Sequence, residues 1–273
     1  MILRTIAVLS ALLSAALYAL LDLSLWLVPV LFVGIGLGLM LAAFLFLWLV
    51  CALIDMDKPQ EHDSKFHRVV TALYIEALKS LVGLKIETQG LEKTPKEGRI
   101  LLVCNHQNES DPGILMHYFR DSQLAFISKK ENQTMFIIGK LMHKLLCQLV
   151  NRENDREALK TILKCIQLIK DDEVSVAVFP EGGIKEKDKL NPFRHGVFKI
   201  AQKTGVPIVV CTLKGTSDLF DNMRKLKPTH VKLHLVDVIP AEDLKGRTSV
   251  DIGEQVYQMM LADLGDEYRL EEA

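Results

Sequence analysis

The chain has 273 residues, of which 49% are hydrophobic and 25% are charged, and its formal net charge is -1. This length suffices for one folded domain with a sizeable core, and the overall charge content excludes a disordered chain and a transporter with many membrane spans. The near-neutral balance also argues against a nucleic-acid-binding protein, which would normally carry a strong basic excess to neutralise phosphates.

The charged side chains are distributed very unevenly along the chain. Of the 33 basic and 34 acidic side chains, only Arg4 and Asp22 lie in the first 54 residues. Residues 5–21 and 23–54 carry no formal charge, and both stretches are long enough to cross a bilayer as a helix. We therefore interpret residues 1–54 as a membrane anchor and residues 55–273 as a separate folded domain.

The anchor is predicted to be a helical hairpin. Asp22, Ser24 and Pro29 form a polar, helix-breaking junction between the two apolar stretches. Backbone groups within lipid must be satisfied internally, so each stretch is expected to be helical, over roughly residues 3–21 and 28–53.

Two other arrangements of the anchor fit the same residues. The first stretch resembles a cleaved signal peptide, since Arg4 gives a positive start and the small residues Ala15 and Ala16 follow the apolar segment. A shallow hairpin within one leaflet is the other alternative, and it would leave the folded domain on the same face of the membrane.

The charges that flank the anchor predict its orientation. Both ends of a hairpin that crosses the membrane lie on one side, and positive residues near the ends favour the cytoplasm. Those residues are Arg4, Lys58, Lys65 and Arg68. We expect the protein in the cell membrane with its folded domain on the cytoplasmic face.

The cysteines agree with a cytoplasmic location. They are scattered, with no CxxC pair and no zinc spacing, so we interpret them as reduced, buried small residues. They are Cys51, Cys104, Cys147, Cys165 and Cys211. The sequence predicts no metal site.

Beyond the anchor, the apolar residues alternate between helical and strand-like spacing. Helical periodicity predicts helices over residues 69–81, 157–170 and 250–264. Short apolar runs predict buried strands over residues 100–104, 124–128, 174–179, 207–213 and 231–238. Strands separated by helices predict an α/β fold with a largely parallel or mixed central sheet flanked by helices, preceded by the N-terminal membrane hairpin.

Two of the predicted strands lead directly into residues that can do chemistry. The strand at residues 100–104 continues as NHQNESDPG, which begins at Asn105, and the strand at residues 174–179 continues as PEGG, residues 180–183. In sheets of this kind, active sites lie just beyond the carboxyl ends of the strands.

His106 and Asp111 form a candidate acid–base pair. On a regular helix, positions five apart point about 140° away from each other, so the two side chains can meet only across a turn. The turn-forming residues Asn108, Ser110 and Pro112 make such a bend plausible. If they meet, Asp111 accepts the proton-bearing nitrogen of His106, and the other nitrogen is available as a general base. A hydrogen-bonded loop histidine beside a helix cap is the alternative.

Together these motifs resemble the glycerolipid acyltransferase family, which includes bacterial 1-acylglycerol-3-phosphate acyltransferases. The NHxxxxD pattern of His106 and Asp111 and the FPEG sequence at residues 179–182 occur in the same order and at a similar separation in that family. Two further family blocks have counterparts in SKKE at residues 128–131, with LVNR at residues 149–152, and in GVPIV at residues 205–209. The resemblance covers residues 66–238.

The resemblance implies a role for each motif residue. His106 would be the general base and Asp111 the carboxylate that orients it. Glu181 would lie in the acceptor site, with Gly182 and Gly183 letting the backbone approach the substrate closely.

Arg152 and Lys129 resemble the positions that meet the acceptor's phosphate, a task suited to charged side chains with several donors. Solvated surface charge is the alternative for these two residues.

The sequence departs from the family at several positions. Gly183 and Ile184 stand where the family usually has threonine and arginine, so one phosphate-binding charge is missing or displaced. Cys147 replaces a customary glycine, and Asn108 replaces a frequent serine. The resemblance therefore implies the reaction, and it leaves open a lysophospholipid acceptor other than 1-acylglycerol 3-phosphate.

The resemblance implies a membrane-bound O-acyltransferase. It would move a fatty acyl chain from acyl-CoA or an acyl-carrier protein to the free hydroxyl of a lysophospholipid, with 1-acyl-sn-glycerol 3-phosphate as the expected acceptor and phosphatidic acid as the product. Its partners would be membrane lipids, the acceptor and the acyl donor, with no nucleic acid and no cofactor. The alternatives are remodelling of another lysolipid, or a catalytically silent lipid-binding scaffold of the same fold.

Overall fold

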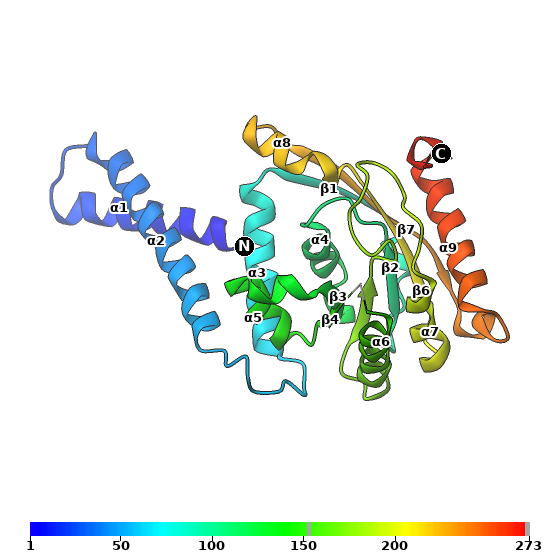
Figure 1. Ribbon diagram of the computed structural model, residues 1–273. Coiled ribbons are helices and arrows are strands. Elements are labelled where there is room, and N and C mark those ends of the chain that lie inside the picture. Colours follow the sequence, from blue (N-terminus) through cyan, green and yellow to red (C-terminus); the bar gives the residue numbers. More distant parts are fainter. Residues whose placement is uncertain (152–153, 271–273) are drawn as a thin grey trace.

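The computed structural model describes residues 1–151 and 154–270. The chain begins with two apolar helices, α1 (Ile2–Leu20) and α2 (Leu27–Ala52), which pack against each other as the predicted hairpin (Figure 1). Where they meet, the hydroxyl of Ser10 lies 3.4 Å from the position that a Cβ would take on Gly36. Small residues therefore allow the close approach of the two helices. By length and composition, both helices suit a membrane span, and their exposed apolar side chains indicate membrane association.

Both ends of the hairpin lie against α3 (Lys65–Leu81). The Tyr74 hydroxyl donates a hydrogen bond of 2.5 Å to the Ala43 carbonyl in α2, and the amino group of Met1 lies 3.8 Å from Glu76 Oε1. Leu47 and Cys51 of α2 are buried with Val70 of α3. The assignment of residues 1–54 and 55–273 to anchor and folded domain stays a prediction, but the contacts join the two parts through α3.

The folded domain is built on a seven-stranded sheet in the order β1-β7-β6-β2-β5-β3-β4. Its strands are β1 (Leu84–Gln89), β2 (Leu101–Cys104), β3 (Leu124–Lys129), β4 (Gln148–Val150), β5 (Ser175–Val178), β6 (Ile208–Lys214) and β7 (Thr229–Ile239). The five strands from β6 to β4 are parallel, and β7 and β1 run the other way because β7 pairs antiparallel with β6. The predicted largely parallel or mixed α/β sheet is thus confirmed as mixed.

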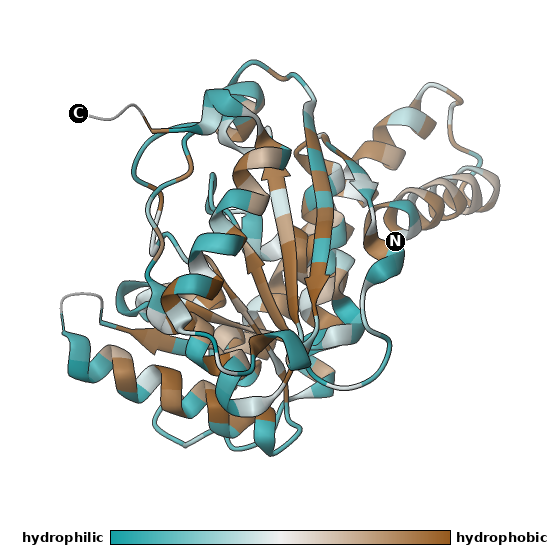
Figure 2. Ribbon diagram, turned by 90° about the vertical axis from the view of Figure 1, so that its right-hand side faces the viewer, coloured by the Kyte–Doolittle hydropathy of each residue, from teal (hydrophilic) through white to brown (hydrophobic). Residues whose placement is uncertain are grey.

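Helices cover both faces of this sheet. On one face, α6 (Asp155–Lys170), α7 (Lys199–Thr204) and α9 (Ser249–Leu264) pack on side chains of β2, β5 and β6. On the other face, α4 (Asp111–Tyr118) packs on alternate side chains of the same strands. Every residue of β2 and β5 is buried, which explains why these central strands are continuous apolar runs (Figure 2).

The predicted elements occur with small shifts at their ends, whereas several others were not expected. Among the missed elements are β1, whose sequence LKIETQ is mostly polar, and the short helices α5 (Phe136–Lys144) and α8 (Leu219–Arg224). Strand β1 pairs only with β7 at the edge of the sheet, so four of its six residues remain exposed. Its formation depends on a partner far along the chain, which local apolar spacing does not reveal.

Candidate active site

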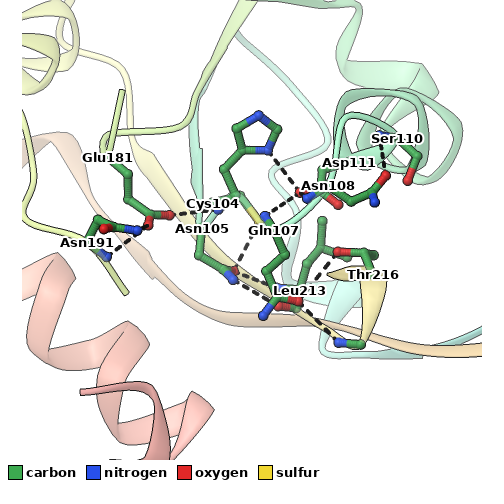
Figure 3. Close-up of polar contacts among 12 residues, drawn as sticks. Cys104, Asn105, Gln107, Asn108, Ser110, Asp111, Glu181, Asn191, Leu213 and Thr216 are labelled. Carbon is green, nitrogen blue, oxygen red and sulfur yellow. Dashed lines mark hydrogen bonds and ion pairs between the residues drawn. The ribbon is translucent and has the colours of Figure 1, made fainter. Parts of the chain in front are cut away.

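The two motifs meet where adjacent parallel strands end. Strands β2 and β5 pair in register from Leu101 with Val176 to Val103 with Val178. His106 and Glu181 follow these strands, so the topology brings residues 75 positions apart in sequence into contact (Figure 3). This location is the carboxyl edge of the sheet, as the sequence predicted.

His106 and Asp111 meet across a tight turn. Nδ1 of His106 lies 2.9 Å from Oδ2 of Asp111. The same oxygen accepts hydrogen bonds from the backbone N–H groups of Gln107, at 2.7 Å, and Asn108, at 2.8 Å. Asp111 is fully buried in the first turn of α4, where backbone N–H groups and the helix dipole favour a carboxylate. The turn therefore closes around one carboxylate oxygen.

This contact selects the free nitrogen of the imidazole. An ionised carboxylate only accepts hydrogen bonds, so Nδ1 of His106 carries the proton that it shares with Asp111. Nε2 of the neutral ring then holds a lone pair. The His106 side chain is 15% exposed, in contrast to the fully buried Asp111, so the ring reaches the surface of the site.

Phe179 fixes the plane of the His106 ring. The two ring centroids lie 4.1 Å apart with an interplanar angle of 15°, and Phe179 stacks in turn on Phe126 at 5.8 Å. This contact was not predicted from the sequence, although Phe179 is the first residue of the FPEG motif. The ring is thus held by a hydrogen bond at its edge and a stacked aromatic ring on its face.

Asn105 and Gln107 fasten the same turn to β6. The Asn105 side chain accepts from the Leu213 N–H at 2.7 Å and donates to the Leu213 carbonyl at 2.9 Å. The Gln107 side chain accepts from the Gly215 N–H at 3.2 Å. The residues on both sides of His106 are therefore tied to the neighbouring strand end.

Glu181 is a buried brace between two loops. Its side chain accepts the backbone N–H of His106 at 2.7 Å through Oε1, and the backbone and side-chain N–H groups of Asn191, each at 2.9 Å, through Oε2. Burial raises the pKa of Glu181, whereas these hydrogen bonds act in the opposite direction. Glu181 is only 1% exposed. Its predicted contact with the acceptor stays a prediction, and its observed contacts position the backbone of His106.

Gly182 and Gly183 have backbone conformations that favour glycine. Their φ angles are 73° and 146°. A Cβ on Gly182 would lie 2.8 Å from Nε of Arg194, whose backbone N–H donates to the Pro180 carbonyl at 2.8 Å. At Gly182, a side chain would therefore be strained by the backbone conformation and would also displace the Arg194 side chain.

The predicted phosphate-binding residues lie at the periphery or outside the described residues. Lys129 is exposed at the carboxyl end of β3, the strand next to β5, so it shares the edge of the sheet with His106. Arg152 lies outside the described residues. Ile184, at the family's usual arginine position, is 42% exposed and presents an apolar side chain there.

The cysteines and other metal-ligating residues form no second centre in the part of the chain described. All five cysteines are free and buried, as predicted, and burial raises the pKa of Cys147 to about 11 and that of Cys165 to about 12. Among residues 1–151 and 154–270, no group of three or more His, Cys, Asp or Glu side chains is placed to hold a metal ion. Around His106, the carboxylates of Asp111 and Glu181 converge, one on the imidazole and the other on the backbone N–H.

Comparison with known proteins adds to this geometry. Residues 85–214, which include both motifs, match the family model described as Acyltransferase. Over these residues, just under half of its length, the chain is therefore similar to the acyltransferase family. It is also similar to a chloroplastic 1-acyl-sn-glycerol-3-phosphate acyltransferase of Brassica napus, 33% identical over 57% of this chain and 44% of that protein. A probable enzyme of the same name from Mycoplasma pneumoniae is 30% identical over 64% of each chain.

The acyltransferase relatives overlap with this chain only in part, because the chain spans about half to two thirds of the length of these first two proteins. The enzyme of Escherichia coli is 28% identical over 61% of this chain and 66% of its own. The crystal structure of the 1-acyl-sn-glycerophosphate acyltransferase of Thermotoga maritima matches over 96% of both chains, with a TM-score of 0.63 and 18% identity. This likeness confirms the fold.

The contacts of Glu181 lead to a test of its role. In Glu181→Gln, one accepting oxygen becomes an NH2 donor, so either His106 or Asn191 loses its acceptor. Because hydrogen bonds to charged groups contribute about 1.5–3 kcal/mol, we expect kcat for acyl transfer to fall roughly tenfold or more with little change in the acceptor KM.

Glu186→Gln, a change in an exposed residue of the same loop, is the matched control and should leave both constants unaltered. A raised acceptor KM with an unchanged kcat in Glu181→Gln would instead indicate that Glu181 contacts the acceptor directly.

Proposed function

We propose that this chain is a membrane-bound O-acyltransferase that moves a fatty acyl chain from an acyl thioester, acyl-CoA or acyl-carrier protein, to the free hydroxyl of a lysophospholipid. The expected acceptor is 1-acyl-sn-glycerol 3-phosphate, which would give phosphatidic acid. The observation that carries the proposal is the His106–Asp111 pair, held in a turn at the carboxyl edge of the sheet in a chain similar to the acyltransferase family. The names of its relatives agree with this acceptor.

The proposed reaction needs one base and two positioned reactants. Nε2 of His106 takes the proton of the acceptor hydroxyl as its oxygen attacks the thioester carbonyl. When the tetrahedral intermediate collapses, the C–S bond breaks, and the imidazolium returns the proton to the leaving thiolate. Asp111 stabilises the transient imidazolium without taking the proton itself. A thioester is already an activated electrophile, so the proposed transfer uses no covalent acyl-enzyme and no cofactor.

Lys129 and Arg152 are the proposed partners of the acceptor's phosphate. Their support is the resemblance of the sequence blocks and, for Lys129, its exposed position at the edge of the sheet that carries His106. The exposed Ile184 favours a second candidate acceptor, a lysolipid with a larger head group, because an apolar side chain replaces a cation there. A catalytically silent lipid-binding scaffold is the alternative from a different class.

The proposed location is the cell membrane, with the folded domain on the cytoplasmic face. The support is the positive charge near both ends of the hairpin, together with the contact of Met1 and α2 with the same helix α3. Labelling of a cysteine introduced at Asp57 tests this orientation, since reagent supplied from the outside should not reach it.

The base proposed for the reaction is tested by His106→Ala and Asp111→Asn. We expect His106→Ala to abolish acyl transfer, because the variant lacks the imidazole that takes the proton in the proposed reaction. Asp111→Asn should lower kcat severely, by about 10⁴-fold if the pair behaves like that of Ser-His-Asp proteases. The measurement is thiol release by purified protein with a panel of donors and acceptors.

His230→Ala removes an exposed histidine on β7 and is the matched control, which should retain activity. Wild-type turnover in His106→Ala would refute the assignment. A wild-type protein that is inactive with every donor and acceptor of the panel would favour the silent scaffold.

The phosphate partners are tested by Lys129→Ala and Arg152→Ala. Loss of one charge-assisted contact, worth about 1.5–3 kcal/mol, should raise the KM for 1-acylglycerol 3-phosphate roughly 10- to 150-fold. The donor KM should change much less. Lys130→Ala, which alters the exposed neighbour of Lys129, serves as the control, and an unchanged acceptor KM in both test variants would remove the two residues from the phosphate site.

A further inference from the structure

Helix α8 and the residue after its end carry large apolar side chains in open solvent. Phe220 is 50% exposed, Met223 is 39% exposed and Leu226 is 95% exposed. These positions are three apart, so the two helical residues lie on one side of α8 and Leu226 extends the row beyond its end. Among the large apolar side chains of the described residues, that of Leu226 is the most exposed.

The backbone of Leu226 is also unusual. Its φ angle is 53°, in the left-handed region that costs a residue with a side chain on the order of 1 kcal/mol. The turn is closed by a hydrogen bond of 3.1 Å from the Leu226 N–H to the Met223 carbonyl. The chain thus holds an apolar side chain outward in a conformation that glycine or asparagine adopts more easily.

This row is continuous with the helix that holds the anchor. The Thr229 N–H, just after Leu226, donates to the Gly83 carbonyl at 3.2 Å, which places the end of α8 beside the turn that follows α3. Leu78 and Leu81 at that end of α3 are 58% and 64% exposed. Figure 1 shows α8 reaching over the end of α3 on the side from which α1 and α2 project.

Basic side chains surround the apolar ones. Arg224, Lys225 and Lys227 are all exposed at the end of α8, and the nearby acidic residue Asp221 lies 3.9 Å from Arg224. Long basic side chains that flank apolar ones place their charges among lipid headgroups while the apolar groups enter the acyl boundary. Three cations against one anion favour an anionic membrane surface.

We propose that Leu78, Leu81, Phe220, Met223 and Leu226, with the basic residues at the end of α8, form a second membrane contact. We call this set the α8 surface. It rests on the same anionic bilayer as the hairpin, and it assumes the proposed membrane association but not the proposed reaction.

The contact would act close to the candidate active site. Helix α8 follows η5 (Thr216–Asp218) directly, and the residues at the start of this segment contact Gln107, the neighbour of His106. Docking of the α8 surface would therefore hold the candidate site close to the membrane at a second point besides the hairpin. An acyl acceptor that dwells in lipid would then reach His106 without passing through bulk water.

The proposal is tested on the full chain in vesicles of phosphatidylcholine and phosphatidylglycerol. A fluorophore sensitive to polarity is attached to Leu226→Cys, which is selective because the native cysteines are all buried. Val250→Cys on α9, where the native valine is 54% exposed, carries the same label as the matched control. We expect lipids with a nitroxide on the acyl chain to quench the label at position 226, and to leave the label at position 250 bright.

The basic residues give a second readout. The triple change of Arg224, Lys225 and Lys227 to alanine should reduce quenching at position 226, because each lost charge weakens the membrane contact roughly fivefold. Vesicles without phosphatidylglycerol should reduce the quenching as well. The label at position 226 would overturn the proposal if it remained unquenched while Trp26 and Trp48 of the hairpin were quenched. A blue-shifted but unquenched label would place another protein surface, such as a second copy of the chain, on Leu226 and would also contradict it.

The labelling result is independent of catalysis. Quenching at position 226 in a protein that transfers no acyl group would leave this inference standing and remove the proposed function. Acyl transfer by a protein whose label at position 226 stays unquenched would support the proposed function and remove the α8 surface as a membrane contact.

Discussion

A single carboxylate oxygen, Oδ2 of Asp111, organises the candidate site. It accepts the His106 ring and two backbone N–H groups, and it can do so only because the chain turns sharply before α4 begins. The turn is held from the other side by Glu181, which accepts the N–H of His106, and from β6 through Asn105. The ends of β2, β5 and β6 thus hold His106, whose Nε2 is not used by these contacts. The precision of the site therefore comes from the buried groups that hold the ring and the backbone of His106.

The buried position of Glu181 connects the two motifs physically. Both motifs follow central parallel strands, and the loops after neighbouring strands lie side by side at one edge of the sheet. A carboxylate from one loop can therefore accept hydrogen bonds from the other loop. Substitution of a buried carboxylate whose two oxygens both accept hydrogen bonds is destabilising, because its partners lose their acceptor. The glutamate of FPEG and the histidine of NHQNESD then depend on each other without any need for a direct contact between their side chains. Phe179 strengthens this dependence because it brings an aromatic ring from the second motif onto the His106 ring.

The central sheet could be predicted from the sequence because its strands are buried on both faces and therefore consist almost entirely of apolar residues. The edge strand β1 could not, since most of its residues are exposed and its partner β7 lies far along the chain. His106 and Asp111 were predicted from their spacing and from turn-forming neighbours. The hydrogen bonds of Glu181 to His106 and Asn191 and the stacking of Phe179 on His106 were not predicted. Spacing along the chain does not show which way a side chain points once two strands are adjacent. For Arg152 the predicted role remains open to experiment, as this residue lies outside those described.

The proposed direct acyl transfer, assisted by His106, is tested most sharply by measuring free thiol and acylated acceptor together in the wild-type protein. Purified protein receives a radiolabelled acyl thioester, first alone and then with 1-acylglycerol 3-phosphate. Without acceptor, direct transfer predicts no burst of free thiol and no label on the protein. Once acceptor is present, it predicts one acylated acceptor for each thiol released. A stoichiometric burst of thiol without acceptor, with the acyl group retained covalently on the protein, would contradict it.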